Sequence, residues 1–114
     1  MIKDPSVVII GSGPSGFYAA ESITKKLNSD IIEIHNRPKY LQLIRNGTKA
    51  KIILYFHNDP LTMNGSKTTK DRIFLLNFAS TIVFNSQWSK KRFLEEMPRS
   101  SINSDKLFVI YQSS

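Results

Sequence analysis

Short apolar runs alternate with helical segments along the whole chain, and this alternation is the feature that most constrains the fold. The apolar runs are Val7–Ile10, Asp30–Ile34, Lys51–Phe56, Thr81–Phe84 and Leu107–Tyr111. Helical spacing of apolar residues is seen over residues 17–27, 39–44, 70–78 and 87–97, with Thr68 or Thr69 and Ser86 as expected N-caps. Short runs rich in β-branched residues are typical of buried parallel strands. The pattern predicts an α/β, Rossmann-like sheet of about five mostly parallel strands with helices on both faces.

The length of 114 residues fits one domain, residues 1–114. No apolar run approaches the roughly 18 residues of a membrane span. The start, Met1–Pro5, lacks the features of a secretory signal, and there is no cysteine, so we expect a cytoplasmic protein. The 16 Lys and Arg against 9 Asp and Glu give a net charge of +7, which favours phosphate-bearing partners such as nucleotides, nucleic acid or an anionic membrane.

A glycine-rich loop follows the first predicted strand and opens the first predicted helix. It reads Gly11, Ser12, Gly13, Pro14, Ser15 and Gly16. In a dinucleotide site Gly11 permits the tight turn, Gly13 admits the pyrophosphate, and Gly16 lets helix and strand pack closely. Glu33, at the end of the second predicted strand, is suited to accept hydrogen bonds from a ribose. The alternative is that the glycines only form a tight strand–helix turn.

Two predicted strand ends repeat the same pattern, and a third adds another asparagine. The stretches are Ile34-His35-Asn36-Arg37-Pro38, Phe56-His57-Asn58-Asp59-Pro60 and Val83-Phe84-Asn85-Ser86. Carboxyl ends of parallel strands share one sheet edge, where ligands bind. Histidine exchanges protons near neutral pH, and asparagine can hydrogen-bond to sugar hydroxyls. His57, near the middle of the predicted sheet, is the candidate catalytic residue. The alternative is that His35 and His57 only fasten their loops.

Residues 29–114 resemble the N-terminal, acceptor-side domain of group 1-type GT-B glycosyltransferases, which assemble lipopolysaccharide and other surface glycans. The similarity rests on DIIEIHNRPKYLQLI, KIILYFHNDPLTMNGSK, TIVFNSQWSKKRF and DKLFVIYQSS. It implies that a sugar or lipid-linked sugar acceptor binds at the strand ends, while a second domain holds the nucleotide-sugar donor. By this resemblance the cleft contains His35, Asn36, Arg37, His57, Asn58, Asp59, Asn85 and Ser86.

Residues 6–27 instead resemble the FAD/NAD(P)-binding segment of adrenodoxin-reductase-like ferredoxin–NADP reductases, through VIIGSGPSGFYAAE. That similarity implies a bound FAD or NAD(P), with the glycine loop and Glu33 as its contacts. The two resemblances meet near residues 25–29, which suggests a chimera of a glycine-rich βα unit, residues 1–28, with a transferase-like part, residues 29–114.

These observations favour a partial glycosyltransferase that is inactive alone, with a FAD- or NAD(P)-binding reductase fragment as the alternative. A basic interaction domain without a small ligand is a third interpretation. The basic cluster Lys90–Arg92 is suited to an anionic membrane face, or simply forms a solvated helix surface. Trp88 and Phe93 are both expected on the buried face of their helix, and no nucleic-acid-binding motif accompanies them. The acidic residues are too scattered to suggest a metal site.

Overall fold

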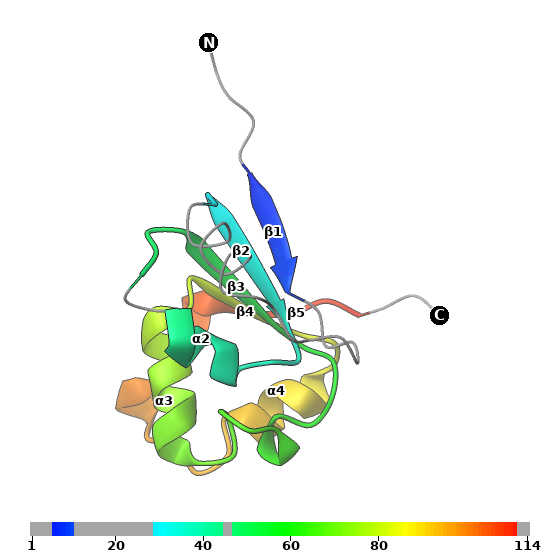
Figure 1. The fold of residues 1–114 in the computed structure, drawn as a ribbon. Helices are drawn as coiled ribbons and strands as arrows, with labels where there is room; N and C mark the ends of the chain where they lie inside the picture. Colours follow the sequence, from blue (N-terminus) through cyan, green and yellow to red (C-terminus); the bar gives the residue numbers. More distant parts are fainter. Residues whose placement is uncertain (1–5, 11–28, 45–46, 112–114) are drawn as a thin grey trace.

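The computed structural model describes residues 6–10, 29–44 and 47–111 (Figure 1). Its centre is a five-stranded parallel sheet whose strand order, β1-β2-β3-β4-β5, is the order of the chain. The strands are β1 (Val7–Ile10), β2 (Ile31–His35), β3 (Lys51–Phe56), β4 (Thr81–Phe84) and β5 (Leu107–Val109). The α/β, Rossmann-like class predicted from the alternating runs is therefore confirmed.

The described helices follow the predicted segments. They are α2 (Lys39–Ile44), α3 (Thr69–Phe78) and α4 (Gln87–Phe93), with short 3₁₀ turns η1 (Pro60–Thr62), η2 (Arg99–Ser101) and η3 (Ser104–Lys106). The Thr68 hydroxyl accepts a hydrogen bond from the backbone N–H of Asp71, and the Ser86 hydroxyl accepts one from Ser89. Both predicted N-caps are therefore present. None of the helices in the described ranges is long and apolar enough to cross a membrane.

The hydrophobic core lies on one face of the sheet. Its strand residues include Ile32, Ile34, Ile52, Leu54, Phe56, Ile82 and Phe84, and its helix residues include Leu41, Ile44, Leu75, Leu76 and Phe93. All three described helices thus pack on the same face, whereas helices on both faces are expected from the sequence. The physical reason is the strand order, because right-handed crossovers that always advance in one direction place successive helices on one side. The helix expected over residues 17–27 lies outside the described residues.

The opposite face of the sheet carries the alternate residues of each strand. A row across it pairs His35 with Tyr55, Tyr55 with Val83, and Val83 with Phe108. Val83 is buried, His35 and Tyr55 are half-buried, and Phe108 is exposed. This row lies next to the carboxyl edge of the sheet. It brings the His35 ring of β2 and the Tyr55 ring of β3 together there.

Helix α4 ends at Phe93, whereas the sequence predicts that it continues to Met97. The chain turns after Leu94 and adopts a left-handed conformation at Glu96, with a φ of 62°. The buried guanidinium of Arg72 on α3 donates hydrogen bonds to the carbonyl oxygens of Phe93 and Glu95, both at 2.7 Å. These bonds satisfy the carbonyls of Phe93 and Glu95, which have no partner within the helix once it ends at Phe93.

The aromatic residues of α4 do not share one face as predicted. Phe93 is fully buried in the core, but Trp88 is 58% exposed. Ser89 and Phe93, which are four residues apart, occupy the buried stripe, and Trp88 lies beside that stripe. The expectation of a buried Trp88 is therefore wrong.

Candidate functional site

The two histidines of the repeated strand-end pattern contact each other. His35 is the last residue of β2, and His57 directly follows β3. Nδ1 of His35 lies 2.9 Å from Nε2 of His57, and the planes of the two rings differ by 7°. A centroid separation of 5.1 Å together with that short nitrogen–nitrogen distance places the rings edge to edge. The two strand ends thus lie close together, as predicted, and a hydrogen bond joins the imidazoles of His35 and His57.

A carboxylate extends this pair on the same sheet face. Oε1 of Glu33 lies 3.2 Å from Nε2 of His35, so the polar chain runs from Glu33 through His35 to His57. Glu33 is located two residues before the end of β2, because the strand continues to His35. The Tyr55 ring stacks on the His35 ring with centroids 4.3 Å apart and an interplanar angle of 6°. Glu33 therefore contacts one edge of the His35 ring, and Tyr55 packs on one of its faces.

The site shifts the pKa values of two of its groups. Burial lowers the pKa of His57 below its ordinary value of 6.5, and the neighbouring His35 lowers it further. Burial also raises the pKa of Tyr55, as does the negative charge of Glu33. At neutral pH the imidazole of His57 is therefore uncharged and the phenol of Tyr55 is protonated.

Two asparagines of the predicted ligand site form hydrogen bonds to the backbone of His57. The side-chain oxygen of Asn36 accepts a hydrogen bond from the backbone N–H of His57 at 2.7 Å. The side-chain amide of Asn85 donates to the carbonyl oxygen of His57 at 2.8 Å, and its oxygen accepts from the Ser89 hydroxyl at 3.2 Å. Strand ends on both sides of β3 thus position the catalytic candidate.

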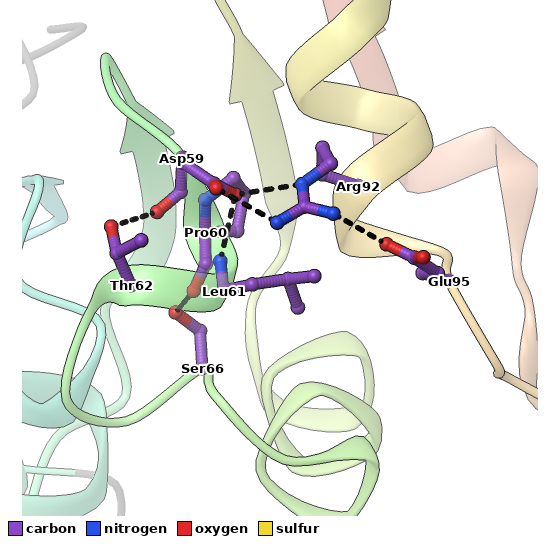
Figure 2. A network of polar contacts seen from close by, with 7 residues as sticks. All are labelled: Asp59, Pro60, Leu61, Thr62, Ser66, Arg92 and Glu95. Carbon is purple, nitrogen blue, oxygen red and sulfur yellow. Dashed lines mark hydrogen bonds and ion pairs between the residues drawn. The ribbon is translucent and has the colours of Figure 1, made fainter.

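Asp59 belongs to a separate network that shapes the loop after β3 (Figure 2). Its carboxylate accepts hydrogen bonds from the backbone N–H of Leu61 at 3.0 Å and from Arg92 of α4 at 3.2 and 3.0 Å. Arg92 also donates to Glu95 at 3.0 Å. The hydrogen bonds from Arg92 lower the pKa of Asp59. The role of Asp59 in this arrangement is to fasten η1 to α4.

The same loop packs closely against the start of α2. Gly65 has a φ of 97°, and a Cβ placed there would lie 2.5 Å from the backbone nitrogen of Lys39. Only glycine fits this approach. Beside it, a pocket of about 340 Å³ is lined by Asn36, Arg37, Lys39, Tyr40, Leu43, Met63 and Asn64. Arg37 therefore lines this pocket, Asn58 is exposed, and Ser86 serves as the cap of α4.

A second pocket, of about 200 Å³, lies at the carboxyl edge of the sheet next to the histidine pair. Its walls are His35, Tyr55, Phe56, His57, Val83, Phe84, Asn85 and Ile110. The walls are mainly apolar, with the imidazoles and the Asn85 amide as polar groups. Tyr55 and Val83 are pocket residues that the sequence analysis missed. The signal for Tyr55 is its place two residues before His57, because alternate residues of a strand share a face.

The glycine loop Gly11–Gly16 lies outside the described residues, so its contacts with FAD or NAD(P) stay a prediction. Within residues 6–10, 29–44 and 47–111, no group of three or more His, Asp or Glu side chains is arranged to hold a metal ion. No protein-family model, no curated protein and no solved structure matches the chain.

Proposed function

We propose that this chain is the acceptor-side part of a nucleotide-sugar-dependent glycosyltransferase. In this proposal a sugar acceptor binds in the pocket at the carboxyl edge of β3 and β4, and His57 accepts the proton of the attacking hydroxyl. The observation that carries the proposal is the hydrogen-bonded pair of His35 and His57 at the wall of that pocket. The resemblance of residues 29–114 to the N-terminal domains of such enzymes supports the same interpretation.

The pocket has the composition of a small-ligand site, because mainly apolar walls enclose a few polar groups. The Tyr55 ring offers a flat apolar surface for the C–H face of a sugar. The neighbouring Asn85 amide and the imidazole of His57 lie where hydroxyl groups need hydrogen-bond partners. Stacking on one face and hydrogen bonding at the edge together favour a saccharide over a purely apolar ligand.

The protonation of His57 suits general base catalysis. Burial and His35 lower its pKa, so that the ring is neutral and can accept a proton at neutral pH. In the proposed reaction the O–H bond of the acceptor breaks and its proton moves to His57. The oxygen forms a bond to the anomeric carbon of the donor sugar, and the nucleoside diphosphate departs with the bonding electron pair.

The family resemblance assigns the donor to a second Rossmann-like domain and the products to surface polysaccharide or lipopolysaccharide. We therefore propose that the chain alone does not transfer sugar, because the donor must be closed against the acceptor in a water-poor cleft. For a lipid-linked acceptor, we propose that the chain associates with the inner membrane face through α4. There the exposed Trp88 lies beside the exposed Lys91.

A titration monitored by NMR of the histidine and tyrosine rings tests the acceptor site. The probes are octyl glucoside, octyl galactoside, octyl mannoside and octyl N-acetylglucosaminide below their micelle concentrations, with octanol as the control for the alkyl chain. We expect at least one glycoside, and not octanol, to shift the ring signals of Tyr55 and His57. Shifts with octanol alone, or no shift with any glycoside, would contradict the proposal.

The same samples distinguish the reductase-like interpretation. FAD or NADPH is added to the chain in place of the glycosides, and flavin binding is also monitored by absorbance. Tight binding of either dinucleotide without any response to a glycoside would favour the dinucleotide-binding alternative over the acceptor site.

A further inference from the structure

We infer that Glu33 is a positioning residue that fixes the tautomers of His35 and His57, so that Nδ1 of His57 is the nitrogen that accepts a proton. The inference deepens the proposed function and rests on it for the identity of the reaction. The tautomers themselves are inferred from the contacts among Glu33, His35 and His57.

The first step is the contact between Glu33 and His35. An ionised carboxylate only accepts hydrogen bonds, so Nε2 of His35, 3.2 Å from Oε1 of Glu33, must carry the ring proton. A neutral imidazole has one protonated nitrogen, which leaves Nδ1 of His35 as an acceptor.

The second step is the contact between the two rings. Nδ1 of His35 lies 2.9 Å from Nε2 of His57 and needs a donor, so the proton of His57 is on Nε2. Nδ1 of His57 is then the unprotonated nitrogen. Because Glu33 can only accept a hydrogen bond, it determines which nitrogen of His35 is protonated, and His35 in turn determines which nitrogen of His57 is protonated.

Tyr55, a further titratable group of the site, stacks on the His35 ring through its face rather than its nitrogens. It therefore leaves the order of protons unchanged. When His57 accepts a proton at Nδ1, the new positive charge lies one ring away from the carboxylate of Glu33, which stabilises it.

The test measures the protonation of the histidine ring nitrogens directly by NMR and needs no sugar. The chain is labelled with ¹⁵N-histidine and measured at about pH 8, above the ordinary histidine pKa. We expect both histidines to be protonated at Nε2, with a scalar coupling across the hydrogen bond from Nε2 of His57 to Nδ1 of His35. His57 protonated at Nδ1 in the parent chain would overturn the inference.

Two substitutions of Glu33 and one control complete the experiment. Glu33→Leu removes the acceptor, and Glu33→Gln replaces it with an amide that can either donate or accept. Glu33→Leu is expected to populate the other tautomer of His35 and to weaken or abolish the coupling. Glu33→Gln should have a smaller effect, because its amide oxygen can still accept the Nε2 proton. Lys51→Leu, which removes a charge from the neighbouring strand on the same face, should leave the tautomers and the coupling unchanged. Unaltered tautomers in a folded Glu33→Leu chain, which keeps no acceptor at this position, would overturn the inference.

The outcome is separable from that of the proposed function. If the tautomers are as inferred but no glycoside binds, the acceptor-site proposal fails and the role of Glu33 in ordering the ring protons stands. If a glycoside binds but His57 carries its proton at Nδ1, the acceptor-site proposal stands and the inferred role of Glu33 fails.

Discussion

Asn36 of the first His-Asn pattern accepts a hydrogen bond from the backbone of His57 in the second, over a distance of 2.7 Å. The repetition of the pattern at two strand ends thus has a structural explanation, because one copy holds the other. Asn36 adopts a φ of 56°, a left-handed conformation that asparagine tolerates better than most residues. The hydrogen bond and the backbone conformation both favour asparagine at this position.

Substitution of Asn36 should separate these two contributions. We expect Asn36→Ala to lower the free energy of unfolding by about 1–3 kcal/mol, because it loses the hydrogen bond and strains the backbone. Asn36→Gly loses only the hydrogen bond and should be the less destabilised of the two. Urea unfolding of the three chains measures both effects. An Ala variant as stable as the parent would contradict this explanation.

The lowered pKa of His57 makes stability depend on pH in a defined window. The unfolded chain binds a proton at His57 with the ordinary pKa of 6.5, whereas the folded chain binds it only at lower pH. Because the unfolded state binds more protons in this window, the free energy of unfolding should fall as the pH drops below 6.5 towards the folded pKa. His57→Phe should show a smaller fall over the same range. Identical pH slopes for the two chains would contradict the lowered pKa.

The strands could be predicted from sequence because β-branched runs bounded by polar residues carry their own local signal. Val7–Ile10, Lys51–Phe56 and Thr81–Phe84 have the predicted bounds. The packing of the three described helices on one face of the sheet could not be predicted, since it depends on which strands become neighbours. Local patterns also contain no information about contacts such as that between Asp59 and Arg92, which are distant in the chain.

Two features of the candidate site could be predicted from the sequence: its location at the carboxyl edge of the sheet and the presence of both histidines there. Parallel strands that each end in histidine must bring those residues to one side of the sheet, and His35 and His57 do meet there. The hydrogen bonds of Asn36 and Asn85 were not predictable, because the same amide can bind a sugar or a backbone. Whether the amide reaches the backbone of another strand depends on a separation of a few ångströms between strand ends, which only the folded chain sets.

Arg72 should contribute strongly to stability through the hydrogen bonds of its guanidinium to backbone carbonyl oxygens. Its buried guanidinium donates to the carbonyl oxygens of Phe93 and Glu95, and its Nε donates to that of Thr68. Arg72→Met leaves these carbonyls unsatisfied and should cost about 2–4 kcal/mol in urea unfolding. The exposed Arg99→Met is the matched control and should change stability by less than about 0.5 kcal/mol. Equal effects of the two substitutions would contradict the assigned role.

Trp88 is the single tryptophan of the chain, so its fluorescence reports the proposed membrane contact directly. Vesicles of phosphatidylglycerol should shift its emission to shorter wavelength, whereas vesicles of phosphatidylcholine should not. Lys91→Ala should weaken the response, because it removes an exposed positive charge near the indole. Unchanged emission with anionic vesicles would contradict membrane association through α4.

The affinity of Tyr55→Leu for a glycoside tests the central claim, that a saccharide binds beside the histidine pair. The octyl glycoside that gives the largest ring shifts is titrated into the parent chain, Tyr55→Leu and the matched control Phe78→Leu, whose half-exposed ring lies on α3. Loss of aromatic stacking is worth about 0.5–1.5 kcal/mol, so Tyr55→Leu should raise the dissociation constant about 2- to 10-fold. Phe78→Leu should leave it unchanged. Equal dissociation constants for Tyr55→Leu and the parent chain would contradict the acceptor site.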